Sequence, residues 1–361
     1  MAGPLIPPRA AEARGADMEK MKAALLYGAN DVRLEEVDRP RPAAHEVIVK
    51  VEVALTCGTD LKAYHRGYHA MLGQFPTAFG HEFAGVVVAV GDEVARFTPG
   101  MRVVAANSAP CNSCFYCRVG QSSLCDNLEF LNGAYAEYIR VPPSIVRQNL
   151  LPIPPQLSFQ QAAICEPLAC VVHGIEESNV KMGDTVAVIG AGPIGLMLVR
   201  LAKLKGARVI VIGRNDFKLE RAKQLGADEA ISIYENPNPE GLIREMTEGR
   251  GVDVAIEAVG LPEIWERTID ITRKGGTVNL FGGCEKGTSV RVDTEKLHYH
   301  ERKILGVFHH TPRYIATALG LVARDPSGFD VLVTHELPLS ELKGAFNIID
   351  GRHALKVAIV P

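Results

Sequence analysis

The chain contains 361 residues, more than one compact hydrophobic core usually accommodates, so two domains are expected. Hydrophobic residues make up 47% and charged residues 22%, which excludes a collagen-like, disordered or low-complexity chain. Lysine and arginine number 39 against 42 aspartates and glutamates, and the net charge of −3 gives no reason to expect a nucleic-acid partner, so small molecules are the favoured ligands.

The N-terminal segment, residues 1–20, mixes charged residues with proline and alanine and is predicted to be a loose extension. It lacks the apolar centre of a signal peptide, and no apolar run in the chain reaches the roughly 18 residues that cross a bilayer. We therefore expect a cytoplasmic protein that does not enter a membrane.

After this extension, the chain is rich in short β segments separated by glycine and proline turns. Residues 47–55, 83–90 and 134–141 are predicted to form strands. The composition changes near residues 165–174, and we place a domain boundary there.

Three residues that bind metals well lie at the ends of the first two of these strands. Cys57 follows the first strand in the sequence CGTD, and His81 and Glu82 precede the second in the sequence GHE. A thiolate, an imidazole and a carboxylate form the mixed ligand set of a catalytic zinc ion that keeps one position open. The pattern indicates a metal site, although a lone histidine before a strand is also typical of a structural hydrogen bond.

Four of the eight cysteines form the pattern CxxCxxCx7C, at Cys111, Cys114, Cys117 and Cys125. Cysteines at this spacing on an irregular loop can turn their sulfur atoms toward one centre, and four thiolates form the closed shell of structural zinc. The alternatives are a pair of disulfides, which a cytosolic location disfavours, four unrelated thiols, which this spacing makes improbable, and an iron–sulfur cluster, which uses the same ligands. A closed shell leaves no open position, so the expected zinc ion holds a loop in place and takes no part in catalysis.

A nucleotide site is predicted in the second half of the chain. The apolar run 186–189 is typical of a buried parallel strand, and a glycine-rich turn, a helical pattern and a second strand at 209–212 follow it. This order matches the dinucleotide-binding fingerprint, in which the glycines allow a tight turn and a close approach of the backbone to a pyrophosphate at a helix N-terminus. The candidate cofactor-binding residues in the turn are Gly190, Gly192, Pro193, Ile194 and Gly195.

The end of the second strand bears on the choice of cofactor. An NAD site places an acidic residue there, whereas an NADP site removes that charge and supplies an arginine. Here Gly213 is followed by Arg214, with Lys218 one helical turn further on. A guanidinium matches a 2′-phosphate by charge-assisted hydrogen bonds, so NADP is favoured over NAD. The alternative is that Arg214 is a solvated surface charge and that Asp216 binds the ribose.

The remaining apolar runs, at residues 252–256, 277–281 and 303–308, are separated by helical segments. This alternation predicts a doubly wound parallel sheet and an α/β fold class.

Taken together, these motifs resemble the zinc-containing medium-chain dehydrogenase/reductase superfamily, the zinc alcohol dehydrogenases. The pattern GHE-x2-G-x5-G-x2-V, from Gly80 to Val94, matches the zinc motif of that family at every position. The four-cysteine lobe and the GAGPIG turn follow in the order of the family, and the resemblance covers residues 21–361. The sequence Glu166-Pro167-Leu168 resembles the polyol (sorbitol) and threonine dehydrogenase branch.

The resemblance implies a β-rich, GroES-like catalytic domain made of residues 21–170 and 310–361. A Rossmann dinucleotide-binding domain, residues 171–309, is implied between these two parts. The relatives of this branch are often tetramers, so a homo-oligomer, and specifically a homotetramer, is expected.

The resemblance also implies two zinc ions per subunit. Cys57 and His81 resemble catalytic-zinc ligands, and Glu82 is similar to the glutamate that binds or leaves the metal as substrate binds. Glu166 resembles a second carboxylate that binds the zinc ion directly or through a water molecule.

Two features of the resemblance concern proton transfer and the substrate pocket. Thr59 resembles the hydroxyl that passes the substrate proton onward, but Lys62 stands where many relatives carry a relay histidine, so the relay ends either at Lys62 or in water. Polyol dehydrogenases tend to carry an Arg-Glu pair where this chain has His300-Glu301. Four histidines are concentrated there, and they belong either to the substrate pocket or to the ordinary surface and core: His298, His300, His309 and His310.

The implied reaction is the reversible oxidation of an alcohol or polyol, with hydride transfer to a nicotinamide cofactor. An enzyme that mainly reduces aldehydes or ketones with NADPH would use the same residues. A catalytically silent relative that retains only the fold is the alternative from another class.

Overall fold

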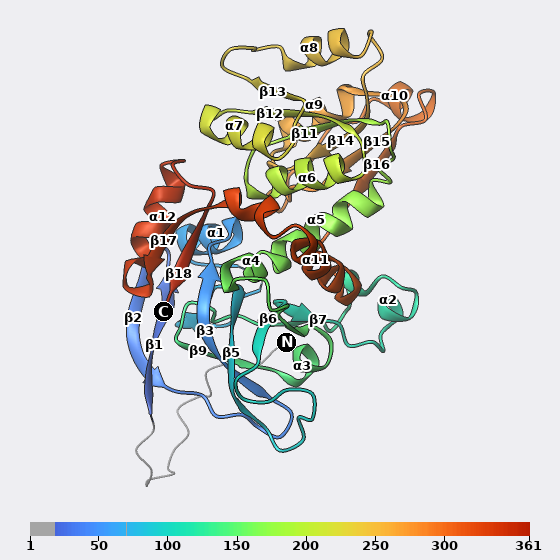
Figure 1. The fold of residues 1–361 in the computed structure, drawn as a ribbon. Coiled ribbons are helices and arrows are strands. Elements are labelled where there is room, and N and C mark those ends of the chain that lie inside the picture. The colour runs from blue at the N-terminus through green and yellow to red at the C-terminus, as the bar shows by residue number, and fades with distance from the viewer. Residues whose placement is uncertain (1–18, 70) are drawn as a thin grey trace. The chain divides into compact units, whose positions relative to one another are not determined.

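The computed structural model describes residues 19–69 and 71–361, which divide into two compact units (Figure 1). The first unit ends at Ala169 and also takes in His310–Pro361, whereas the second comprises Cys170–His309. The predicted extension up to residue 18 lies outside the described residues, and the first strand begins at Lys20.

The first unit is built around a seven-stranded sheet. Its strands follow the order β10-β6-β5-β3-β18-β17, and β9 pairs with β3. Their bounds are Val47–Leu55 for β3, Glu82–Val90 for β5, Arg102–Ala105 for β6, Tyr138–Val141 for β9, Leu150–Pro152 for β10, Val333–Pro338 for β17 and Lys356–Val360 for β18. Their apolar side chains pack with Phe79, Tyr135 and Phe346 into one core.

Smaller elements surround this sheet. Strands β1 (Lys20–Gly28), β2 (Asp31–Asp38) and β4 (Thr77–Ala78) form a second sheet, and β7 (Ser108–Ala109) pairs with β8 (Glu129–Phe130). The helices are α1 (Gly58–Arg66), α2 (Phe115–Arg118), α3 (Pro143–Gln148), α4 (Phe159–Ala163), α11 (Pro312–Arg324) and α12 (Leu342–Asp350), with 3-10 turns at Ser122–Leu124, Pro326–Leu332 and Leu339–Glu341. Helix α5 (Cys165–Glu177) contains the end of the first unit and the start of the second.

Strand pairing brings three distant parts of the chain to one place. Strands β3 and β5 are antiparallel, with Leu55 opposite Glu82, and β18 is antiparallel to β3, with Ala358 opposite Leu55. The end of β3 and the start of β5 therefore meet beside β18. The segment that begins with Thr56 and Cys57 leaves the sheet at this point and enters α1.

The second unit contains a six-stranded parallel sheet in the order β13-β12-β11-β14-β15-β16. The strands are β11 (Thr185–Ile189), β12 (Arg208–Gly213), β13 (Glu229–Ser232), β14 (Val252–Glu257), β15 (Thr272–Leu280) and β16 (Lys303–Gly306). The connecting helices are α6 (Pro193–Leu204), α7 (Asp216–Gln224), α8 (Pro239–Met246), α9 (Pro262–Asp270) and α10 (Thr294–His298). The strand order reverses between β11 and β14, which is where dinucleotides bind in doubly wound sheets.

The strands predicted at 47–55 and 83–90 are confirmed, and so is the parallel α/β sheet of the second unit. The strand predicted at 134–141 is shorter, because Tyr135 and Ala136 pair instead with β1, through a backbone hydrogen bond and an isolated bridge. Among the described residues, no helix has both the length and the apolar character that crossing a bilayer requires.

Candidate active site

The donor atoms of Cys57, His81 and Glu82 lie within 4.8 Å of one another. Cys57 is the N-cap residue of α1, and its Sγ accepts a hydrogen bond from the backbone N–H of Thr59. His81 and Glu82 are buried at the start of β5. The structure therefore brings together the three residues whose types first indicated a metal site.

Behind His81 lies a buried chain of hydrogen-bonding groups that the sequence analysis did not identify. Nδ1 of His81 is 3.0 Å from Oδ1 of Asp60, and the hydroxyl of Tyr135 donates to Oδ2 of Asp60 at 2.7 Å. Burial lowers the pKa of His81, but the negative charges of Asp60 and Cys57 outweigh it and raise that pKa well above its usual value. Because Nδ1 is engaged by Asp60, Nε2 is the nitrogen that remains for a metal.

A buried lysine from the end of the chain contacts Glu82. Nζ of Lys356 lies 2.7 Å and 2.5 Å from the two carboxylate oxygens of Glu82, and it also donates to the carbonyl oxygen of Thr56 at 3.0 Å. Burial raises the pKa of Glu82 to about 7, with the charge of Glu166 adding to the rise and that of Lys356 opposing it. The sequence signal that could have identified Lys356 is a single cation directly before the apolar run 357–360 at the end of the chain.

Glu166 lies in the first turn of α5 and is buried. Its Oε1 is 3.5 Å from Nε2 of His310, and the same nitrogen is 2.9 Å from Oδ1 of Asn107. The four histidines that are clustered in the sequence therefore do not share one environment. His310 is buried beside Glu166, whereas His298 is exposed on α10.

Thr59 and Lys62 lie on α1, immediately after Cys57. The side chain of Thr59 is half-buried and that of Lys62 is exposed. Burial lowers the pKa of His69, which the sequence analysis did not single out, and the positive charges of His81 and Lys62 lower it further. A histidine in the loop after the CGTD motif is the only sequence signal that pointed to it.

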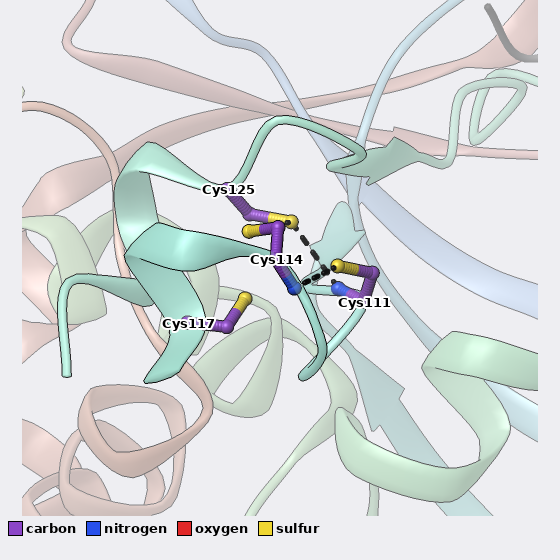
Figure 2. A group of neighbouring side chains, drawn as sticks. All are labelled: Cys111, Cys114, Cys117 and Cys125. Atoms are coloured by element: carbon purple, nitrogen blue, oxygen red, sulfur yellow. Dashed lines mark hydrogen bonds between the residues drawn. The ribbon is translucent and has the colours of Figure 1, made fainter. Parts of the chain in front are cut away.

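The four cysteines of the CxxCxxCx7C pattern form a second donor group. Figure 2 shows their sulfur atoms turned toward one another from α2 and the loops beside it. The donor atoms lie within 4.8 Å of one another, and the Sγ atoms of Cys114 and Cys125 are 3.9 Å apart. All eight cysteines are free thiols, so the disulfide interpretation is wrong for this structure.

Hydrogen bonds and charges within this group favour a bound cation. The N–H of Cys111 donates to Sγ of Cys125 at 3.2 Å, and the N–H of Cys114 donates to Sγ of Cys111 at 3.4 Å. Hydrogen bonds from Ser113 and Cys114 lower the pKa of Cys111 to about 5, whereas burial and the neighbouring thiols raise the pKa of Cys117 to about 12. Four thiolates this close repel one another, so a cation is needed before all four can be charged.

The glycine-rich turn lies at the carboxyl end of β11, beside the reversal of strand order. Gly190 has a φ of +110°, and its N–H donates to the carbonyl of Ile212 at 2.9 Å. A Cβ on Gly195 would lie 1.8 Å from the carbonyl oxygen of Gly190, so this close approach requires glycine. Gly192 caps α6 without a side-chain hydrogen bond, which leaves the helix N-terminus available to a phosphate.

The end of β12 carries the residues proposed to select the cofactor. Gly213 is the last residue of the strand, and Arg214 is exposed directly after it. Asn215 caps α7 by accepting a hydrogen bond from the N–H of Lys218 at 3.1 Å, and the side chain of Asp216 is exposed. No carboxylate stands at the strand end itself.

Comparisons with known proteins agree with this geometry. Residues 43–155 match the alcohol dehydrogenase GroES-like domain, and residues 193–324 match the zinc-binding dehydrogenase domain. The chain is 33% identical to sorbitol dehydrogenase of Halalkalibacterium halodurans, over 93% of this chain and 97% of the relative. It is also 33% identical to L-threonine 3-dehydrogenase of Bacillus subtilis, over 95% of this chain and 99% of the relative. Among solved structures, it is similar to a protein of Sinorhizobium meliloti 1021 described as a zinc-binding dehydrogenase and bound to NADP, with a TM-score of 0.87, 31% identity, and coverage of 95% and 100%.

Proposed function

We propose that this chain, which belongs to the zinc-binding dehydrogenase family with an alcohol dehydrogenase GroES-like domain, oxidises a polyol or a related secondary alcohol with NADP, and catalyses the reverse reduction. The chain is an NAD(P)-dependent dehydrogenase; the substrate, the preference for NADP and the residue roles are the proposed parts. The observation that carries the proposal is the convergence of the Cys57, His81 and Glu82 donor atoms within 4.8 Å.

The proposed ligands of a catalytic zinc ion are Cys57, His81 and Glu82, with Glu166 as a nearby second carboxylate. Sulfur, nitrogen and oxygen donors in a buried site suit zinc with one exchangeable position. When bound, zinc polarises an alcohol oxygen, and the dinucleotide accepts a hydride. The hydrogen bond that Asp60 accepts from Nδ1 of His81 orients the His81 ring, and Lys356 contacts the Glu82 carboxylate from the side of β18.

Proton transfer is assigned to α1. Thr59 is half-buried two residues from Cys57, where its hydroxyl can accept the proton of the substrate hydroxyl and donate its own onward. Lys62 is exposed one turn further along the helix, where the surrounding water, or the Lys62 amine in its unprotonated form, takes up the proton. The expected role of Thr59 therefore depends on its position between a buried donor group and the solvent.

The four-cysteine lobe is proposed to hold a second, structural zinc ion. Its ligands are Cys111, Cys114, Cys117 and Cys125, which close the shell and leave no position for substrate. Two zinc ions per subunit are expected, and metal analysis of the purified protein measures this directly. One ion per subunit would contradict the catalytic assignment, and a coloured protein would indicate iron–sulfur ligation of the lobe.

The proposed preference for NADP depends on Arg214, with Lys218 one turn further along. Replacing Arg214 by alanine removes the guanidinium that pairs with a 2′-phosphate, so kcat/KM for NADP should fall by about tenfold or more, with little change for NAD. The control is Arg221→Ala on α7, because Arg221 lies seven residues beyond Arg214 and hydrogen-bonds Gln224. A clear preference of the unmodified protein for NAD would overturn this assignment.

The substrate is tested by a panel of polyols, L-threonine and simple secondary alcohols, each assayed with NADP and NAD. The highest kcat/KM on a polyol supports the proposal, and the highest kcat/KM on threonine would contradict the substrate class while leaving the dehydrogenase assignment in place.

A homo-oligomer, specifically a tetramer, is also proposed. Light scattering on the purified protein measures the mass of the assembly.

A further inference from the structure

Glu257, the last residue of β14, is fully buried and uses its carboxylate to bind backbone. Its Oε1 accepts hydrogen bonds from the N–H groups of Val259 at 2.6 Å and Gly260 at 2.8 Å. Burial raises the pKa of this carboxyl group, and the two N–H donors oppose that rise. Burying a carboxyl group is costly, and here it holds a turn at the carboxyl edge of the sheet in one conformation.

The same residue also holds the turn that follows β15. The backbone carbonyl of Glu257 accepts hydrogen bonds from the N–H groups of Phe281 at 3.1 Å and Gly282 at 2.9 Å. A Cβ on Gly282 would lie 2.7 Å from Oε2 of Glu257 and 2.5 Å from the nitrogen of Gly260, so the two turns are in direct contact. The indole N–H of Trp265 donates to the carbonyl of Gly282 at 3.0 Å and completes the arrangement.

These two turns adjoin the glycine-rich turn after β11. The N–H of Ala258 donates to the carbonyl of Ile189 at 2.9 Å, and a Cβ on Gly190 would lie 2.9 Å from Cγ2 of Val259. Glu257 therefore fixes the turns after β14 and β15 against the turn that begins the dinucleotide fingerprint.

The strand order shows which part of a dinucleotide these turns can reach. The end of β12, with Arg214, lies on one side of β11, and the ends of β14 and β15 lie on the other. If the pyrophosphate binds at the Gly190–Gly195 turn and the adenosine ribose near Arg214, the nicotinamide half must extend over the turns after β14 and β15. We infer that Glu257 is a positioning residue that holds in place the turns forming the binding site for the nicotinamide half of the cofactor. This inference rests on the proposed function.

The test separates the two halves of the cofactor by binding. Affinities of the purified full-length protein are measured for NADPH and NADH, and for the adenosine fragments 2′,5′-ADP and 5′-ADP. In Glu257→Ala the affinity for the preferred dinucleotide should fall about tenfold, whereas the affinity for the matching adenosine fragment should not change. Glu257→Gln retains an oxygen acceptor for both N–H groups and should restore most of the affinity. The matched control is Glu263→Ala, an exposed glutamate near the start of α9.

Trp265 is the one tryptophan of the chain, so its emission reports on the turn after β15 in every variant. Gly282→Ala disturbs the contact between Gly282 and Glu257 without removing the carboxylate. It should lower the affinity for the dinucleotide more than the affinity for the adenosine fragment. If Glu257→Ala lowers the affinities for the dinucleotide and for the adenosine fragment equally, or lowers neither, the inference is overturned. Failure of the unmodified protein to bind either dinucleotide would instead overturn the proposed function.

Discussion

The two donor groups of the first unit are built in different ways. The cysteines of the four-cysteine lobe lie close together in the chain, and hydrogen bonds from nearby backbone N–H groups hold their sulfur atoms. In the group of Cys57, His81 and Glu82, buried Asp60 and Lys356 contact the donors from separate strands and helices. The difference indicates that the lobe is specified locally and stabilises a loop, whereas the buried group depends on the whole core and has the surroundings of a reactive site.

The largest expected effect on activity comes from the buried group. Cys57→Ser or His81→Ala should lower kcat by about a thousandfold or more, because each removes a donor on which polarisation of the substrate depends. Cofactor affinity, measured by quenching of Trp265 emission, should be retained. Cys170→Ser is the matched control, since Cys170 belongs to neither donor group. Substantial activity in either variant would contradict the assignment of the catalytic group.

A substitution in the four-cysteine lobe should lower the stability of the protein rather than its catalytic activity. Cys117→Ser removes one of four ligands, so we expect the loss of one zinc equivalent and of roughly 4 kcal/mol in the free energy of unfolding. Metal analysis and denaturant unfolding measure both quantities. The activity per correctly folded molecule should change little, and an unchanged zinc content would be inconsistent with the proposed shell.

Lys356 tests whether the buried group depends on distant charges. Lys356→Met leaves the buried carboxylate of Glu82 without its ammonium partner, which should cost about 3–5 kcal/mol in the free energy of unfolding. Adding Glu82→Gln removes the unpaired charge, so the double variant should be more stable than Lys356→Met alone. Simple additivity of the two effects in denaturant unfolding would show that the pair is not coupled.

The smallest effect is expected at Tyr135, two contacts away from the metal donors. Tyr135→Phe removes the hydrogen bond to Asp60 and should cost about 1 kcal/mol of stability, with a few-fold decrease in kcat/KM. Tyr138→Phe is the control, because the Tyr138 ring stacks against Arg39 at the edge of the sheet. Equal effects of the two substitutions on kcat/KM would argue that Tyr135 does not position His81 through Asp60.

Much of the fold and of the candidate site could be predicted from the sequence where the information is local. The glycine turn, the strands on either side of it and the cysteine spacing each involve neighbouring residues, and the structure contains the turn and the cluster where they were expected. The types of Cys57, His81 and Glu82 indicated a metal site because few other sites combine these donors. Two of them, His81 and Glu82, are adjacent in the chain, and the third follows the strand that pairs with theirs.

The sequence by itself determined the family and the fold class, and it indicated the candidate metal donors, because these depend on residue type and short spacing. Only the tertiary structure decided what surrounds those residues. Lys356 lies 274 positions from Glu82, and Tyr135 lies 75 positions from Asp60. Such partners are brought together by strand register and by burial of the apolar core, and neither leaves a fixed spacing in the chain.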